Sequence, residues 1–348
     1  MQVQKLGDSG LSISKIIVGC MSFGNKKFGE WVIDDEEKVF SILKKCYDNG
    51  LRTFDTADVY SNGTSEILLG KFLKKYKIPR NKVVILTKCY FPNESENPDF
   101  HYRLVASAPA YEYANGRGLS RKHIFDAVQA SVARLGTYID VLQIHRLDSE
   151  TPKREIMKAL NDVVEQGLAR YLGASSMKAT EFAQLQFVAD KNGWFKFISM
   201  QNYYNLTYRE EENEMIPFCN DSEFGKVGLI PYSPLARGVL TRPVGKESEF
   251  NRTANTDASQ KLYKVDELSE ADTEIINRVE ELAKKYAVSM ATIGTAWVLS
   301  KGACPIVGIN SEKRVDDYLA AVEFKLSEED NKYLEEPYVT KQQHLFLK

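Results

Sequence analysis

The chain has 348 residues, of which 43% are hydrophobic and 27% charged, a composition typical of a globular protein. Its length suits one large domain or two ordinary ones. The formal net charge of −2 offers no basic surface for nucleic acid or for an anionic membrane, so we expect neither kind of partner.

The cysteines and the absence of long apolar runs favour a cytoplasmic protein. A chain of this size does not need disulfides, no CxxC occurs, and the number of cysteines is odd. No apolar run approaches the ~20 residues of a membrane span. Neither the N-terminus nor the end of the chain, Leu345 to Lys348, resembles a targeting signal. The widely spaced cysteines are Cys20, Cys46, Cys89, Cys219 and Cys304.

A short hairpin is predicted first, followed by about eight strand-then-helix units, the pattern of a parallel α/β sheet. Eight such units favour one (β/α)8 TIM barrel domain over residues 1–348, rather than an open sheet. The hairpin joins 3–6 to 11–13. Strands are predicted at 15–19, 51–55, 83–88, 139–145, 169–173, 196–201, 228–232 and 304–308. Helices are predicted from Asp34 and Asp35 onward and at 64–73, 121–135, 152–165, 178–190, 211–221, 271–286, 289–299 and 311–321.

Several helix ends carry local signals. The acidic pair Asp34 and Asp35 suits a helix N-terminus. Ser120 is placed to cap the helix predicted at 121–135, and Gly136 to end it. Pro152 fits the first turn of the helix that it begins.

Three segments depart from this rhythm: residues 89–119, 235–270 and the irregular tail from Glu335. Long loops inside a compact domain are usually functional. The first two follow the third and seventh barrel strands, so we expect them on the active-site face, where the loops after the strands meet.

Four polar residues lie at or just after the ends of three predicted strands. Asp55, Lys88 and His145 each close a strand, and Tyr60 follows Asp55 in the next loop. Alone, each is more often structural: a cap or ion-pair partner, a solvated lysine, a satisfied histidine or a packing tyrosine. Their combination at the strand-end face of a barrel predicts an active site.

These side chains suit proton transfer to a carbonyl. A free tyrosine has a pKa of about 10, and a nearby ammonium lowers it by favouring the phenolate. A buried carboxylate keeps the ammonium charged and fixed. His145 can orient a carbonyl by a hydrogen bond. A hydride must come from a cofactor, because no side chain supplies one.

Six motifs in this chain resemble the signatures of the aldo-keto reductases. They are Asp55-Thr56-Ala57-Asp58-Val59-Tyr60, Leu86-Thr87-Lys88, Gln143-Ile144-His145-Arg146, Gly173-Ala174-Ser175-Ser176, Gln201-Asn202, and Tyr232-Ser233-Pro234-Leu235-Ala236-Arg237-Gly238. The long loop after the third strand and the run from Asn115 to Ser120 resemble the aryl-alcohol dehydrogenase branch.

The resemblance implies an NAD(P)(H)-dependent oxidoreductase that interconverts aldehydes or ketones and alcohols. It implies a catalytic tetrad of Asp55, Tyr60, Lys88 and His145, with Tyr60 as general acid/base. The chain has no G-x-G-x-x-G and no Walker loop, so a dinucleotide would bind without either. The resemblance places Ser175, Ser176 and Gln201 on the nicotinamide carboxamide and Tyr232 under the ring. It also places Gly19, Cys20 and Met21 beside the nicotinamide, Ser233, Pro234, Leu235, Ala236, Arg237 and Gly238 on the pyrophosphate, and Gly308, Asn310, Ser311, Lys313 and Arg314 around the adenosine phosphate.

We predict NADP(H) rather than NAD(H). Lys313 and Arg314 occupy the first turn of a predicted helix, where cations are unfavourable unless an anion binds. Arg242 and Arg252 in the loop after the seventh strand extend toward the same phosphate, and Asp317 is placed to hydrogen-bond the adenine. The alternative is that Asp316 and Asp317 merely balance Lys313 and Arg314. The chain also departs from many family members, with Ser176 in place of asparagine and Gly308-Ile309 in place of Lys-Ser.

The predicted substrates are aromatic or other apolar carbonyl compounds rather than sugars. Six aromatic residues lie between 89 and 119, and flat apolar rings bind such ligands well. Trp31, Tyr60, Tyr90 and His145 are predicted to line the substrate pocket. The alternative is that the rings only pack the loop onto the barrel.

A second function, from a different class, also fits this fold and tetrad: a cofactor-binding regulatory or redox-sensing subunit with little turnover. No metal site is predicted.

Overall fold

The computed structural model describes residues 2–95, 97, 100–245, 257 and 259–343. Two sequence predictions, the phosphate contact by Arg252 and the chain end from Leu345 to Lys348, lie outside these residues.

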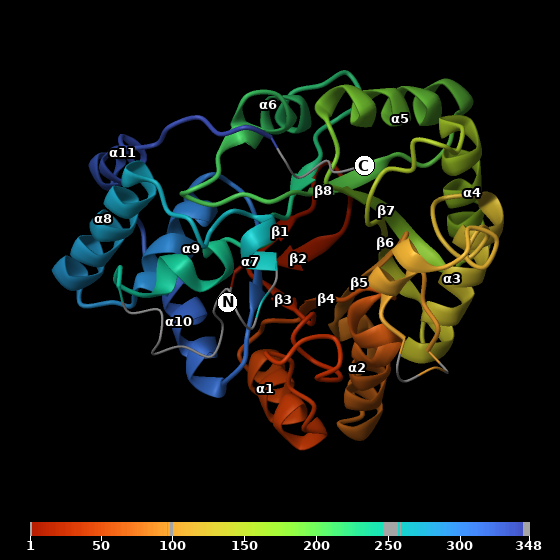
Figure 1. The fold of residues 1–348 in the computed structure, drawn as a ribbon, viewed down its shortest axis with the longest axis horizontal. Helices are drawn as coiled ribbons and strands as arrows, with labels where there is room; N and C mark the ends of the chain where they lie inside the picture. Colours follow the sequence, from red (N-terminus) through yellow and green to blue (C-terminus); the bar gives the residue numbers. More distant parts are fainter. Residues whose placement is uncertain (1, 96, 98–99, 246–256, 258, 344–348) are drawn as a thin grey trace.

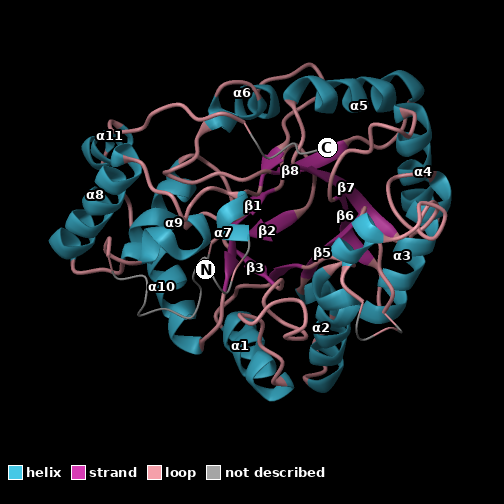
Figure 2. Ribbon diagram, in the orientation of Figure 1, coloured by secondary structure: helices cyan, strands magenta, loops and turns pink. Residues whose placement is uncertain are grey.

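Eight parallel strands form the centre of the molecule, as Figure 2 shows. Seven pairings link them in the order β10-β3-β4-β5-β6-β7-β8-β9. The ends of the sheet meet through a parallel bridge between Tyr232 and Ile306, and the Ile306 amide donates to Pro231 O at 2.8 Å. The predicted barrel is therefore confirmed. The strands are β3 (Ile17–Gly19), β4 (Thr53–Asp55), β5 (Val84–Cys89), β6 (Ile139–Ile144), β7 (Ala169–Ser175), β8 (Phe197–Gln201), β9 (Gly228–Leu229) and β10 (Ile306–Gly308).

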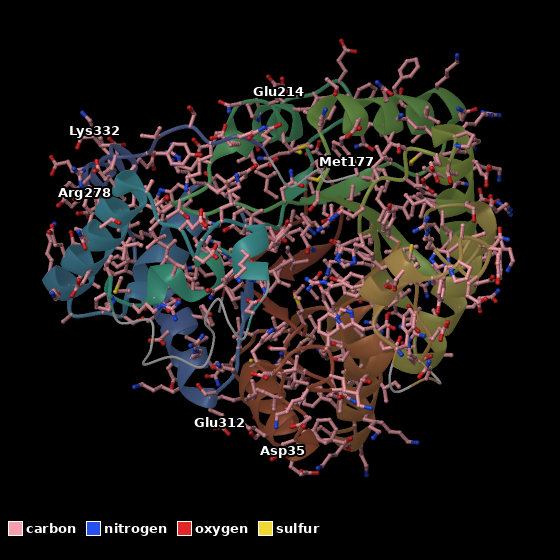
Figure 3. The ribbon with its side chains drawn as sticks, in the orientation of Figure 1. Asp35, Met177, Glu214, Arg278, Glu312 and Lys332 are labelled. Carbon is pink, nitrogen blue, oxygen red and sulfur yellow. The ribbon has the colours of Figure 1, made fainter. Side chains whose placement is uncertain are left out.

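Helices surround these strands in chain order, from α1 and α2 through α3, α4 and α5 to α10 (Figure 1). Figure 3 labels Arg278 of α8 and Lys332 of α11 on neighbouring helices at the outer edge, and Arg278 donates to Tyr333 O at 2.7 Å. The helices are α1 (Glu36–Asp48), α2 (Thr64–Lys75), α3 (Arg121–Leu135), α4 (Lys153–Glu165), α5 (Ala179–Asn192), α6 (Met215–Asn220), α7 (Ser259–Leu262), α8 (Glu270–Tyr286), α9 (Met290–Ser300), α10 (Glu312–Glu323) and α11 (Glu328–Glu335).

The predicted caps are present in α1 and α3. The Asp35 carboxylate accepts from the Lys38 amide at 3.1 Å, and Ser120 accepts from the His123 amide at 3.2 Å. Gly136 ends α3 in a left-handed conformation, with φ of 68°. Pro152 differs slightly, because it is the N-cap residue of α4 and not part of its first turn.

One helix prediction in the C-terminal half was wrong, and one helix was not predicted. The predicted helix at 211–221 is broken into a 3-10 turn (Glu210–Glu212) and the six-residue α6. Pro217 explains the break, because its ring clashes with the carbonyl four residues earlier and so ends any helix that approaches from that side. No helix was predicted between 321 and the tail, where the structure has α11, whose capping box, formed by Ser327 and Asp330, is its clearest sequence signal.

The hairpin closes the N-terminal end of the barrel. It pairs β1 (Val3–Lys5) with β2 (Ser12–Ser14) in antiparallel register. Its buried residues Leu6 and Ile13 pack in one apolar cluster with inward-facing strand residues. Successive strand residues face opposite sides, so the barrel interior carries a second layer of side chains, in which Lys88 and Gln143 lie two positions beyond Leu86 and Val141. That layer is polar, and it lies at the carboxyl ends of the strands. The apolar strand residues are Ile17, Leu86, Val141 and Ile230, and the polar ones Asp55, Lys88, Gln143 and Gln201.

Candidate active site

The structure brings the four predicted catalytic residues together at the carboxyl ends of β4, β5 and β6. The Lys88 ammonium donates to the Asp55 carboxylate at 2.5 Å, to Thr56 O at 2.9 Å and to the Tyr60 hydroxyl at 3.2 Å. The rings of Tyr60 and His145 meet edge-on with centroids 5.8 Å apart. Lys88 is fully buried and Asp55 only 2% exposed, so this ion pair lies beneath the site, shielded from water.

A strained turn sets the position of Tyr60. The next three residues, Ser61, Asn62 and Gly63, all have left-handed backbone, with φ of 48°, 53° and 88°. The Asn62 side chain donates to Glu94 O at 2.6 Å and accepts from the Glu94 amide at 2.9 Å, which fixes the turn to the loop after β5. Glycine adopts this backbone without steric cost, but at Ser61 and Asn62 it costs of order 1–3 kcal/mol per residue and persists where surrounding contacts enforce it.

Two glutamines hold the other oxygen of Asp55. Gln143 and Gln201 donate to Asp55 Oδ1 at 2.9 and 3.0 Å, and Gln201 also donates to Gln143 Oε1 at 2.8 Å. Sequence reasoning missed this role for Gln143. The signal was its position two residues before His145, which places both side chains on the inner face of β6.

Gly173 makes room for this network. It lies where the β7–β8 register shifts, and a Cβ there would stand 2.4 Å from Ser199 Oγ and 2.9 Å from Gln143 Cγ. A glycine in a strand interior often marks a bulge or a close approach of this kind.

Burial and neighbouring charges perturb the titration of the tetrad. Burial, assisted by Arg146 and Lys88, holds the pKa of His145 well below its ordinary value, so the imidazole is neutral near pH 7. Burial raises the pKa of Tyr60, and Lys88 opposes this rise without overcoming it. The expected net lowering of the tyrosine pKa is therefore wrong for this structure, because desolvation outweighs the ammonium. Burial acts to lower the pKa of Lys88, but Asp55 and Tyr60 outweigh it and the net shift is upward.

A cavity of about 840 Å³ opens above the tetrad. It runs from the loop after β3 across the barrel mouth to the start of α10. Most of the residues predicted for catalysis, cofactor or substrate line it: Gly19, Met21, Trp31, Asp55, Tyr60, His145, Ser175, Gln201, Tyr232, Ser233, Pro234, Leu235, Arg237, Gly238, Arg242, Gly308, Asn310, Ser311 and Arg314.

The remaining predicted residues do not line the cavity. Cys20 packs in the core between barrel and helices, and Ala236 is fully buried there too. Lys88 lies beneath the floor, and Ser176 is 5% exposed with its hydroxyl 3.4 Å from the Tyr232 hydroxyl. Tyr90 packs its ring against Phe91. Lys313 is exposed on the outer side of α10, and the Asp317 backbone oxygen accepts from Thr292 Oγ1 at 3.2 Å.

Two asparagines after β8 hold neighbouring loops in left-handed conformations. The Ser176 amide, at φ of 51°, donates to Asn202 Oδ1 at 2.9 Å. Asn205 donates to the carbonyl of Ser233, whose φ is 52°, at 3.1 Å. Asn202 in turn donates to the buried carboxylate of Glu211, and burial raises the pKa of Glu211 to about 7. Sequence reasoning quoted Asn202 only as part of a motif and assigned no role to Asn205 or Glu211.

At the far end of the cavity, α10 begins at Glu312 with Ser311 as a cap that makes no side-chain hydrogen bond. Arg314 reaches the cavity. In the alternative, Asp316 and Asp317 balance Lys313 and Arg314; the structure pairs Asp316 with Lys45 of α1 at 2.8 Å. In Figure 3 the labelled Asp35 and Glu312 mark the starts of α1 and α10, two helices that pack together.

A family model of the aldo/keto reductase family matches residues 15–338, more than nine-tenths of the chain. The chain belongs to the aldo/keto reductase family. This aldo/keto reductase carries the expected hairpin and barrel, with the tetrad at the strand ends where the cavity opens.

Fungal relatives extend over nearly the whole reductase chain. A Saccharomyces cerevisiae protein named "Putative aryl-alcohol dehydrogenase AAD16" is 56% identical over 340 residues, 97% of each chain. A Schizosaccharomyces pombe protein named "Putative aryl-alcohol dehydrogenase C977.14c" is 58% identical, over 96% of this chain and 94% of its own. The versiconal hemiacetal acetate reductase of Aspergillus parasiticus is 54% identical over 345 residues, 99% of each chain. The resemblance to the aryl-alcohol dehydrogenase branch is thereby confirmed at the level of sequence.

An aromatic wall borders the tetrad side of the reductase cavity. Phe91 packs edge-on against His145 with centroids 5.1 Å apart, and against Tyr102 at 5.0 Å. Phe28, for which no role was predicted, contacts Tyr60 at 6.4 Å and Trp31 at 6.2 Å between ring centroids.

The five cysteines are all buried and free. Among the described residues every helix is too short or too polar to cross a bilayer.

Proposed function

We propose that this aldo/keto reductase is an NADP(H)-dependent oxidoreductase that interconverts aldehydes or ketones and alcohols, with Tyr60 as general acid/base. The observation that carries the proposal is the chain from the Tyr60 hydroxyl to Lys88 and on to Asp55, lying at the floor of a cavity large enough for a cofactor and a small substrate. A bound nicotinamide cofactor would supply or accept the hydride, which no side chain can do.

The proton in carbonyl reduction comes from Tyr60. Its hydroxyl accepts from Lys88, so its own hydrogen is directed away from the lysine and is available to a substrate oxygen. As the proton leaves, the developing phenolate lies 3.2 Å from the ammonium, which stabilises it. Lys88 stays charged because Asp55 is held in place by two glutamines. The neutral His145 orients the carbonyl by a hydrogen bond without adding a second positive charge to the site.

The residues around the cavity fit a dinucleotide. We assign Ser175 and Gln201 to the carboxamide, Tyr232 to the ring and the turn from Ser233 to Gly238 to the pyrophosphate. Ser175 Oγ and Ser176 Oγ lie 3.2 Å apart, so the serine that replaces the family's asparagine still belongs to this cradle. The strained backbone at Ser176 and Ser233 is fixed before any ligand arrives, which reduces the entropy lost on binding.

The choice of NADP over NAD rests on Arg314. Its side chain borders the cavity at the N-terminus of α10, where backbone amides and a guanidinium together suit a phosphate. The described residues include no carboxylate within ion-pair distance of Arg314, so its charge is available to the 2′-phosphate. Arg242 borders the cavity as well.

The experiment is steady-state turnover of purified protein, read by NADPH absorbance, on benzaldehyde derivatives, aliphatic aldehydes and aldoses side by side. We expect multiple turnovers with a higher kcat/KM for the aromatic aldehydes, because Phe91, Tyr102 and Phe28 pack in one apolar cluster with Tyr60 and line the cavity. A higher kcat/KM for glucose would contradict the substrate assignment. Tight NADPH binding without multiple turnover would favour the regulatory or redox-sensing alternative.

Two further expectations from the sequence, a single domain over 1–348 and a cytoplasmic location, stay predictions.

A further inference from the structure

Arg146 lies beside the tetrad and has no counter-ion among the residues that the structure describes. It directly follows His145 at the end of β6 and lines the same cavity. One guanidinium nitrogen donates to the His145 backbone oxygen at 2.6 Å, which fixes the side chain at the cavity wall. In the part of the chain that the structure describes, no carboxylate lies within ion-pair distance of Arg146.

The nearby acids are engaged elsewhere. Asp148, two residues further along, accepts from the Leu119 and Glu150 amides and from Thr151 Oγ1, all within 3.0 Å. Asp55 is taken up by Lys88 and the two glutamines. These contacts leave the guanidinium half-buried and unbalanced, a state that favours binding an anion.

Two other cavity cations are paired, one is exposed at the rim, and Arg314 lies at the far end of the cavity, at the start of α10. Lys26 pairs with Asp34 at 3.0 Å, and Arg237 pairs with the buried Asp257 at 2.7 Å. Arg103 is exposed at the rim, where it donates to the Tyr102 hydroxyl at 3.3 Å. Arg146 therefore differs from these cations in its position beside the tetrad.

The field of Arg146 reaches the reacting groups. Burial dominates the pKa shifts of Tyr60, His145 and Tyr232, and on all three Arg146 acts in the lowering direction. A cation that acts on all three lies beside the space in which a carbonyl must sit. Phe91 contacts His145 edge-on, so an aromatic wall adjoins the same space.

We propose that Arg146 binds a carboxylate on the substrate, so that the preferred substrates are aromatic aldehydes carrying a ring carboxylate. The proposal rests on the proposed function and names its substrate class. A planar guanidinium matches a carboxylate in two parallel hydrogen bonds, and the ring between carboxylate and aldehyde lies along Phe91 and Tyr102. In reduction the aldehyde carbon gains the hydride from the cofactor and its oxygen gains the proton from Tyr60, while the carboxylate is unchanged.

The test compares 3- and 4-carboxybenzaldehyde with their methyl esters, which keep the ring and aldehyde but lose the charge. For the wild type we expect one of the two acids to exceed its ester in kcat/KM by about ten- to a hundredfold, the value of charge-assisted contacts. Arg146→Met should abolish that ratio, chiefly through KM for the acid, and because acid and ester are compared on the same variant, any effect of the lost charge on the reacting groups cancels from the ratio. Arg103→Met should keep it. Equal turnover of acid and ester by the wild type, or a ratio that survives Arg146→Met or falls with Arg103→Met, would overturn the proposal.

A binding measurement separates this inference from the proposed function. Calorimetry of 3- and 4-(hydroxymethyl)benzoate, using the isomer of the preferred acid, with the protein and NADPH, which cannot react with an alcohol, reports carboxylate binding even without turnover. We expect binding by the wild type that weakens about tenfold or more in Arg146→Met, with NADPH affinity unchanged. Failure of every aldehyde to turn over, with this binding intact, would count against the proposed function alone. Loss of NADPH affinity in Arg146→Met would assign the residue to the cofactor and refute the inference.

Discussion

Replacing Lys88 with methionine tests whether the buried ion pair organises the site. Lys88 is fully buried and its ammonium lies 2.5 Å from the carboxylate of Asp55, which is 2% exposed. Methionine keeps most of the side-chain volume and removes only the charge and its three hydrogen bonds. Breaking a buried pair strands the remaining carboxylate and costs about 3–5 kcal/mol. We expect the free energy of unfolding, from urea titration followed by circular dichroism, to fall by about that amount.

The matched controls are an exposed pair and a double variant. Lys122 pairs with Asp126 at 2.6 Å on the surface of α3, with both side chains more than half exposed. Lys122→Met should therefore cost less than about 1 kcal/mol. Asp55→Asn combined with Lys88→Met should cost less than the sum of the two single changes, because neither charge is left unpaired. Additive losses, or a Lys88→Met protein as stable as Lys122→Met, would refute a stabilising role for the pair.

Three further predictions follow from the structure. Gly173→Ala should destabilise the fold by about 1–3 kcal/mol through overpacking and lower activity. Gly116→Ala, whose added Cβ has no neighbour closer than 4.0 Å, should do neither. Equal melting temperatures for the two variants would contradict this prediction. The pKa of Glu211 is raised from 4.5 to about 7 by burial, so the folded protein holds a proton that the unfolded chain has lost, and stability should fall as the pH rises through this window. The fall amounts to about 3 kcal/mol at most and should vanish in Glu211→Gln; an unchanged pH profile in that variant would exclude the assignment. Arg314→Ala should weaken NADPH binding about ten- to a hundredfold and NADH binding far less, with the exposed Lys313→Ala as control; equal loss for both cofactors, or a wild type that prefers NADH, would rule out this role.

The grouping of the catalytic residues at the strand ends was predictable because two regularities combine. Alternation within a strand places polar residues on one face, and parallel strands bring their carboxyl ends to one end of the barrel. Asp55, Lys88 and His145 could therefore be grouped from sequence, although they are up to 90 positions apart. Tyr60 was placed beside them because it follows so soon after Asp55.

The supporting contacts were not predictable, because their partners are set only by the closed barrel. Gln201 reaches Asp55 across 146 positions, and no local pattern marks that pair. Nor does sequence give the balance between burial and charge, which reversed the expected direction for the pKa of Tyr60. That Asp148 is held by its own loop, and that Arg146 has no carboxylate partner among the described residues, could not be read from sequence either. The helix predicted at 211–221 failed for a local reason, since Pro217 cannot lie in the interior of a continuous helix.

The most direct test of the account is Tyr60→Phe, which removes the proposed proton donor while keeping the ring that packs against His145. We expect NADPH-dependent reduction of a benzaldehyde derivative to fall by about 10²–10⁴, measured in single turnover so that product release does not mask the chemical step. The affinity for NADPH, from fluorescence titration, should be unchanged. A Tyr60→Phe protein that binds NADPH normally and still reduces the aldehyde within about tenfold of the wild-type rate would contradict the central claim.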